Sequence, residues 1–178
     1  MYEEVLAFWF EEIDDSKWWV KDEAFDREIT ERFSKTHAKA VKCELYEWRS
    51  SAKGRLAEII VLDQFSRNMF RDTAEAFASD PLALALAQEA ISVGADQELD
   101  ARQKGFMYLP FMHSESGKIH EVALKLYTDY GNPYNLDFEI RHKNIIDRFG
   151  RYPHRNAILG RESTAEEVEF LKGPGSSF

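Results

Sequence analysis

LAEIIVLDQFSRNMF, residues 56–70, is the stretch that decides the fold. Its apolar side chains recur at helical spacing, but Leu56, Ile59 and Val61 cannot share one stripe of a helix. A helix that is apolar on several faces must be covered by neighbours on several sides. We therefore predict a central helix here, with other helices packed around it.

The rest of the chain also favours helices, because apolar residues recur at helical spacing almost throughout and alternating runs typical of strands are scarce. Asp80 before Pro81 predicts an N-cap, and Gly94 predicts the end of that helix in a left-handed residue. Further helices are predicted over residues 101–108, ending before Pro110, over 118–130, closed by Gly131, and over 136–149, closed by Gly150. Ser163 or Thr164 with Glu166 or Glu167 three residues on predicts a capping box that opens a last helix to Leu171.

These patterns predict one all-α domain of about eight to ten helices over residues 1–172, followed by a flexible tail over 173–178. The formal net charge is −9, which disfavours a general nucleic-acid binder. The single cysteine, Cys43, allows neither an internal disulfide nor a thiolate zinc site and suits a reducing compartment. An acidic amino terminus and the absence of an apolar run of about 20 residues predict a cytoplasmic protein without a membrane span.

A carboxylate and a guanidinium lie one helical turn apart in the predicted central helix, at Asp63 and Arg67. Buried charges are costly unless paired, so we expect these two groups to bond to each other or to another helix. Such a pair can hold helices together or contribute to a functional site, and the sequence allows both.

His113 and Glu115 follow Pro110, where a break in a helix would leave backbone groups open to side chains or ligands. The two side chains could form a proton-transfer pair, or His113 could be a solvated loop histidine. Their spacing matches no diagnostic metal motif.

His142 lies in an apolar stripe of the predicted helix 136–149, so its ring should face the core. Glu139 and His142 also show the Glu-x-x-His spacing of di-iron bundles, but that architecture needs two copies and the chain has one. We predict no metal and no cofactor.

The segment 141–161 reverses the charge of the chain, with six basic residues against the single acid Asp147. Arg148, Arg151, Arg155 and Arg161 lie on glycine turns and a short helix that begins at proline, where guanidinium groups and free amides suit a carboxylate or phosphate. They could equally bond the acidic side chains of neighbouring helices.

Three segments of the chain resemble a known family. They are LDQFSRN (62–68), YLPFMHSE (108–115) and RFGRYPHRN (148–156), and the similarity runs from VLAFWF (5–10) to LGREST (159–164). They are similar to the signatures of an uncharacterised bacterial family, domain of unknown function 924. The resemblance implies antiparallel helix pairs like those of tetratricopeptide-repeat proteins, and it implies no reaction.

We draw three hypotheses from these patterns: a protein that binds a small anion, an enzyme that uses the same pocket, and a scaffold for a protein partner. The binding hypothesis requires the three motifs to converge on one pocket. In the enzyme, His113 or His154 would be the acid or base and Glu115 its orienting partner. The predicted ligand-binding residues are Asp63, Arg67, Asn68, Arg71, His142, Arg148, Arg151, Arg155, Asn156 and Arg161.

Overall fold

The central apolar stretch forms the innermost helical segment of the structure, a computed structural model that describes residues 1–177. Helix α3 (Ala52–Ile60) continues through a π-helical turn, η4 (Val61–Phe65), into α4 (Ser66–Met69). Every residue from 56 to 66 is buried. The predicted central helix is confirmed, and the π turn inside it is an addition that apolar spacing does not reveal.

The chain forms two compact units. The first unit comprises Met1–Arg71 and Glu75–Pro110. The second unit comprises Asp72–Ala74 and, within the described chain, residues 111–177.

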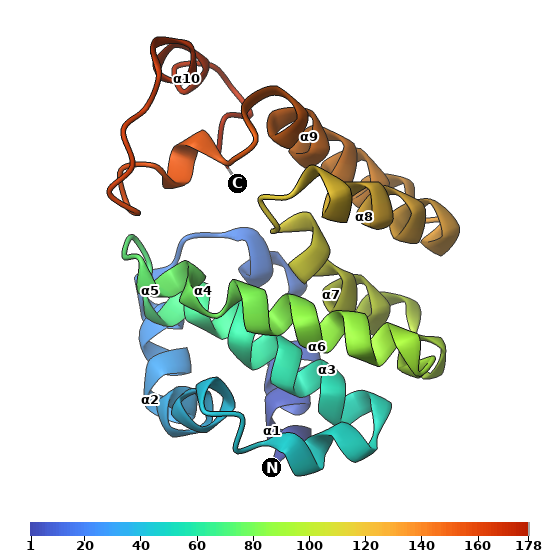
Figure 1. Ribbon diagram of the computed structural model, residues 1–178. Helices are drawn as coiled ribbons and strands as arrows, with labels where there is room; N and C mark the ends of the chain where they lie inside the picture. Colours follow the sequence, from blue (N-terminus) through green and yellow to red (C-terminus); the bar gives the residue numbers. More distant parts are fainter. Residues whose placement is uncertain (178) are drawn as a thin grey trace. The chain divides into compact units, whose positions relative to one another are not determined.

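The first unit, whose helices Figure 1 shows in ribbon form, buries a core rich in aromatic side chains. Helix α3 contacts α1 and α6, and α2 contacts α4. Trp9 makes edge contacts with both Phe65 and Phe106, and all three rings are buried. The elements of this unit are α1 (Tyr2–Ala7), η1 (Phe8–Glu12), η2 (Asp15–Trp19), α2 (Glu23–Val41), η3 (Tyr46–Ser50), α3, η4, α4, α5 (Glu75–Ala78), α6 (Asp80–Ser92), η5 (Ala95–Glu98) and α7 (Ala101–Met112) as far as Pro110.

The second unit is built on the packed helix pair α8 (Gly117–Tyr130) and α9 (Pro133–Phe149), joined by a two-residue turn (Figure 1). Gly131 ends α8 with φ +75°, and Asn132 caps α9 through its side chain. Gly150 ends α9 with φ +69°. The 3-10 turn η6 (Pro153–Arg155) and α10 (Ala165–Phe170) complete the unit.

Local signals located several helix ends correctly. Gly94, Gly131 and Gly150 all adopt the left-handed conformation that the sequence predicts. Thr164 and Glu167 form the predicted capping box at the start of α10. The all-α class is confirmed as well, since no strand occurs among residues 1–177.

Pro110 does not end its helix, so the predicted boundary at residue 108 is wrong. Helix α7 runs through Pro110 to Met112. A proline inside a helix costs about 3 kcal/mol, whereas burying a large apolar side chain gains about 1.5–3 kcal/mol. Phe111 and Met112 are both buried, so their burial offsets the cost of the proline.

Asp80 is not the N-cap that its sequence context predicts. The cap is Ser79, and Asp80 is the first residue of α6. The Asp80 carboxylate accepts two hydrogen bonds from Arg67 instead, at 2.8 and 2.9 Å. A charge-assisted, bidentate pair is stronger than a neutral cap bond, which explains the change of partner.

No helix in the described part of the chain is both long and apolar enough to cross a membrane. Of the predicted tail, Phe178 lies outside the described residues.

Candidate functional site

The LDQFSRN motif forms an ion-pair network in the first unit. The Arg67 guanidinium bonds Asp63 within its own helix, at 3.2 Å, and clamps Asp80 of α6. Asp63 is only 1% exposed. The predicted pairing of Asp63 with Arg67 is confirmed, and the partner on a second helix is Asp80.

Asn68 of the motif and Arg71, three residues after it, both bond to α2. Asn68 donates to the Asp26 carboxylate at 2.8 Å, and Arg71 clamps the same carboxylate at 2.6 and 2.7 Å. Asp26 is 14% exposed in its side chain. In the first unit, therefore, the predicted ligand-binding residues Asn68 and Arg71 connect α2 with the end of the central helix.

Arg151 of the RFGRYPHRN motif clamps Glu167 in the second unit. The two N–H···O distances are 2.7 and 2.8 Å, and the Glu167 side chain is 2% exposed. Thr164 and Asn156 donate to the same carboxylate. Hydrogen bonds from Arg151, more than any other cause, lower the pKa of Glu167 to about 2.

Glu115 is bonded to Arg161 and to the backbone of Tyr152. Arg161 approaches the carboxylate with both terminal nitrogens, at 2.7 and 2.9 Å, and the Tyr152 amide donates at 2.7 Å. Burial opposes ionisation of Glu115, but these hydrogen bonds outweigh burial and hold its pKa below the usual value. Within the second unit, these contacts join the Glu115 end of the YLPFMHSE motif to Tyr152 of the RFGRYPHRN motif and to Arg161.

Arg148 and Arg155 have contrasting surroundings. Arg148 is about half exposed and bonds Glu166 at 2.8 Å on the surface. Arg155 is buried, and its guanidinium carbon lies 4.6 Å from the centre of the Tyr152 ring. The structure thus bonds Arg148, Arg151 and Arg161 to carboxylates, the structural use that the sequence also allowed.

Three of the five histidines of the sequence gather with Arg155 around Tyr152, and a fourth, His113, lies near His142. The rings of His120, His142 and His154 lie 6.3, 5.7 and 5.6 Å from the Tyr152 ring. His113 is close enough to act electrostatically on His142. We call this group the Tyr152 cluster; it consists of Tyr152, Arg155, His113, His120, His142 and His154, all in the second unit.

His142 is the most strongly perturbed histidine of the cluster. Its Nδ1 lies 2.7 Å from the Phe138 carbonyl oxygen, so Nδ1 carries the hydrogen that donates there. Burial is the largest cause that lowers its pKa to about 3, and the charges of His113, His120 and His154 lower it further. The cluster is therefore a region of positive potential in which His142 stays neutral at physiological pH.

His120 is the residue that the sequence analysis missed. It lies on α8 and contacts Glu139 of α9 through Nδ1 and the Ser114 carbonyl oxygen through Nε2, both at 2.8 Å. The Tyr152 hydroxyl is 3.1 Å from the same Nε2. One signal could have found the pair: each residue lies on the buried stripe of its helix, where a polar side chain needs a partner.

The Glu-x-x-His spacing does not form a metal site. Glu139 bonds His120, whereas His142 bonds a backbone carbonyl in its own helix. Across residues 1–177, no three histidine, cysteine, aspartate or glutamate side chains are grouped as metal ligands require.

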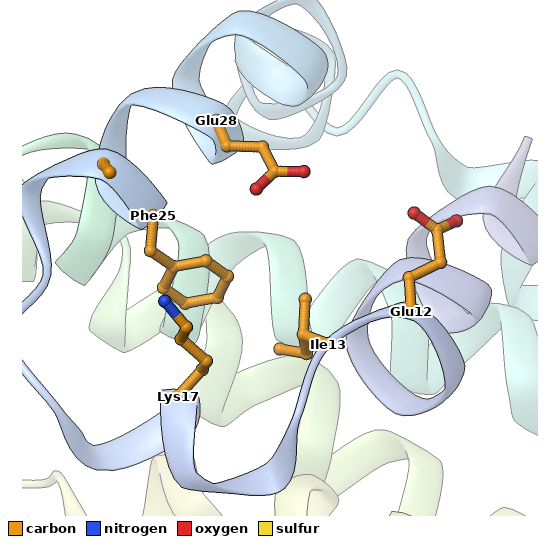
Figure 2. A pocket seen from close by; sticks show the side chains of 6 residues that line it. Glu12, Ile13, Lys17, Phe25 and Glu28 are labelled. Atoms are coloured by element: carbon orange, nitrogen blue, oxygen red, sulfur yellow. The ribbon is translucent and has the colours of Figure 1, made fainter.

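A hollow of about 320 Å³ opens on the first unit, and none of the predicted site residues lines it (Figure 2). Ile13 and Phe25 line it, with Glu12, Lys17 and Glu28 at its edges. Its charges have partners nearby: Arg32 bonds Glu12 at 2.7 Å, and Lys17 bonds Asp22 at 2.5 Å.

Residues 5–175 match the family model "Bacterial protein of unknown function (DUF924)". The chain belongs to this family. This DUF924 chain bonds Glu115 of the YLPFMHSE motif to Tyr152 of the RFGRYPHRN motif in its second unit, and its LDQFSRN motif lies in the first unit.

A solved structure, that of a protein of unknown function, ATU0120, from Agrobacterium tumefaciens, is similar to this DUF924 chain. The two share 41% sequence identity over 97% of each chain, with a TM-score of 0.92. Among curated proteins, none matches.

Proposed function

We propose that this DUF924 protein binds a small carboxylate- or phosphate-bearing ligand at the Tyr152 cluster. The observation that carries the proposal is the gathering of three histidines and the buried Arg155 around one tyrosine ring, with a fourth histidine, His113, near His142. Guanidinium and imidazole N–H groups are the donors that anions recruit in proteins.

The accessibility of the cluster supports the proposal. His113 and His154 are half-buried, so a ligand can reach them from solvent, whereas Arg155 is buried. A charge in such surroundings acts through a low dielectric and attracts an anion more strongly than a surface arginine does.

The other arginines of the motif have a supporting role in this proposal. Arg151 and Arg161 fix the backbone on both sides of the cluster through Glu167 and Glu115. Their own ion pairs hold the segment that carries His154 and Arg155 in place.

Isothermal titration calorimetry with inorganic phosphate and with acetate tests the proposal. We expect saturable heat with the wild-type protein and at least a tenfold weaker association for Arg155→Ala, with Arg155→Lys keeping part of the affinity. Arg148→Ala is the matched control, because this arginine lies in the same segment but is surface-paired with Glu166. Equal affinities for Arg155→Ala and Arg148→Ala would contradict the proposal, as would a lack of heat with both anions.

Binding should also weaken as pH rises, because imidazoles lose their charge around neutrality. The association constant for acetate, whose charge does not change in this interval, should be higher at pH 6 than at pH 8 for the wild-type protein. A constant that rises over this interval would argue for a site without histidines.

An acid–base enzyme is the second candidate, and one observation favours it: Glu139, His120 and the Tyr152 hydroxyl form a continuous chain of hydrogen-bonding groups. A carboxylate that orients a histidine next to a hydroxyl is the arrangement of nucleophilic and acid–base sites. The sequence analysis gave Glu115 the role of orienting the histidine, but Glu115 bonds Arg161 and Tyr152. In the enzyme hypothesis, Glu139 therefore orients His120. The wild-type protein should then hydrolyse aryl ester or aryl phosphate substrates, and Tyr152→Phe should abolish this activity. If the wild-type protein turns over none of these substrates, the enzyme hypothesis is contradicted.

A further inference from the structure

His120 has an oxygen atom opposite each of its ring nitrogens. Nε2 lies 2.8 Å from the Ser114 carbonyl oxygen, and Nδ1 lies 2.8 Å from Glu139 Oε1. A carbonyl oxygen can only accept, so Nε2 must carry a hydrogen. The question is what lies between Nδ1 and the carboxylate.

A neutral imidazole has a single N–H, which Nε2 already uses. The lone pair of Nδ1 would then face a lone pair of the ionised Glu139 carboxylate, and the two would repel each other. Both side chains are 0% exposed, so solvent cannot separate or screen them. One additional proton removes the conflict, whether it lies on the imidazole or on the carboxylate.

We propose that His120 and Glu139 form a buried proton-binding site that keeps one shared proton at neutral and mildly alkaline pH. The shared proton makes the pair neutral overall, with either an imidazolium beside a carboxylate or an imidazole beside a carboxylic acid. This inference is independent of the proposed anion binding, because it concerns only groups inside the fold.

The second carboxylate oxygen supports this site. Within residues 1–177, Glu139 Oε2 is buried and has no hydrogen-bond partner. Loss of the proton would leave a carboxylate with an unsolvated oxygen, which is costly. Burial raises the pKa of Glu139, and the opposing effect of His120 is smaller.

The surrounding titratable groups come from three segments. Lys143 and His142 lie on α9, and Lys143 lowers the pKa of Glu139 slightly. Before α8 lie His113 and Glu115, the latter held by Arg161. After α9 lie Tyr152, His154 and Arg155. Their positive charges would repel a net cation, but a pair with one shared proton is neutral.

The other ring nitrogen of His120 faces the Tyr152 hydroxyl. This hydroxyl donates to the Met112 carbonyl oxygen and lies 3.1 Å from His120 Nε2, whose hydrogen it can accept. The His120 ring thus connects Glu139 of α9 on one side with the RFGRYPHRN segment on the other.

Unfolding as a function of pH tests the inference quantitatively. Above about pH 6.5, an unfolded chain carries a neutral histidine and an ionised glutamate, one proton fewer than the proposed folded pair. By linkage, the unfolding equilibrium constant then rises about tenfold for each pH unit from this site. Glu139→Gln removes this dependence, because an amide donates an N–H to Nδ1 without titrating.

The experiment is urea unfolding, followed by circular dichroism, at pH 7, 8 and 9 for the wild type and Glu139→Gln. We expect the ratio of the wild-type to the variant unfolding constant to rise about tenfold per pH unit. Taking the ratio cancels every titrating group that the two proteins share, including His142. Glu166→Gln is the matched control: it neutralises an exposed carboxylate, and its ratio to wild type should stay flat. A flat ratio for Glu139→Gln overturns the inference.

A second measurement needs no variant, in case Glu139→Gln does not fold. The ring nitrogens of His120 in the wild-type protein should keep constant ¹⁵N chemical shifts from pH 6 to pH 9. A full titration step in these shifts over this range would overturn the inference as well.

Discussion

In the first unit, Arg67 and Arg71 join helices by bonding Asp80 and Asp26, whereas in the second unit Arg151 and Arg161 bond Glu167 and Glu115. In both units, therefore, these arginines connect separate segments of the chain through ion pairs. The units differ in what lies beside these pairs: within residues 1–177, the second unit adds three histidines and a buried arginine around a tyrosine, with a fourth histidine near His142. The comparison teaches that arginine density does not distinguish the two units, whereas the histidines do.

The largest expected effect comes from breaking the clamp of the first unit. Arg67→Ala leaves the buried Asp63 carboxylate and Asp80 without this guanidinium, and removing one partner of a buried pair costs about 3–5 kcal/mol. Urea unfolding measures the loss. Arg67→Lys keeps the positive charge but lacks the planar guanidinium that forms two parallel hydrogen bonds, so it should lose less stability than Arg67→Ala. A loss below about 1 kcal/mol for Arg67→Ala would show that the clamp contributes little.

The clamp of the second unit should respond to pH. Glu167→Gln loses charge-assisted hydrogen bonds from Arg151 and should cost about 1.5–3 kcal/mol at pH 7. Because the folded-state pKa of Glu167 is lowered to about 2, the wild-type advantage is complete above the ordinary glutamate pKa near 4.5 and disappears as pH falls towards 2. Unfolding curves at pH 7, 4 and 2.5 should converge for the two proteins. Curves that keep a constant separation would contradict this assignment.

Replacing a left-handed glycine should lower the free energy of unfolding by the same amount in both units, since the backbone strain is local. Gly94→Ala in the first unit and Gly150→Ala in the second place a side chain at φ +76° and +69°, at about 1–2 kcal/mol each. Gly117→Ala is the control, because its φ is ordinary and no atom crowds its added methyl group. Unequal costs at Gly94 and Gly150 would indicate that one turn has a tertiary role.

The smallest effect is expected at the surface of the second unit. Arg148→Ala breaks an exposed pair with Glu166 and should change the unfolding free energy by at most about 1 kcal/mol. The change should shrink further in 1 M salt, since screening weakens exposed pairs. A loss comparable to that of Arg67→Ala would remove the distinction between surface and buried clamps.

The sequence was sufficient to predict features whose cause is local. Gly131 and Gly150 end helices because a left-handed residue needs no distant partner, and the box of Thr164 and Glu167 spans a single turn. Pro110 was misjudged because its local preference is overridden by the burial of residues that follow it. Local sequence rules therefore predict helix ends correctly where no tertiary packing interaction opposes them.

The candidate site could be predicted only in part. Its arginine and two of its histidines, His113 and His154, stand out in the motifs, and the apolar stripe of a helix singles out His142. The contacts within the second unit join distant segments, however: Glu115 bonds Arg161 across 46 positions, and Glu139 bonds His120 across 19. Helical spacing gives the face of a residue but not the neighbouring helix that it meets. Convergence of the LDQFSRN motif with the other two remains a prediction.

The most direct test of the central claim is an NMR titration with inorganic phosphate that follows the histidine ring resonances. His37, buried in the first unit and bonded to Ser66, serves as an internal control. Our account predicts saturable shifts of His113, His142 and His154 with little movement of His37. Shifts of equal size at all four rings, or none at the Tyr152 cluster, would contradict it.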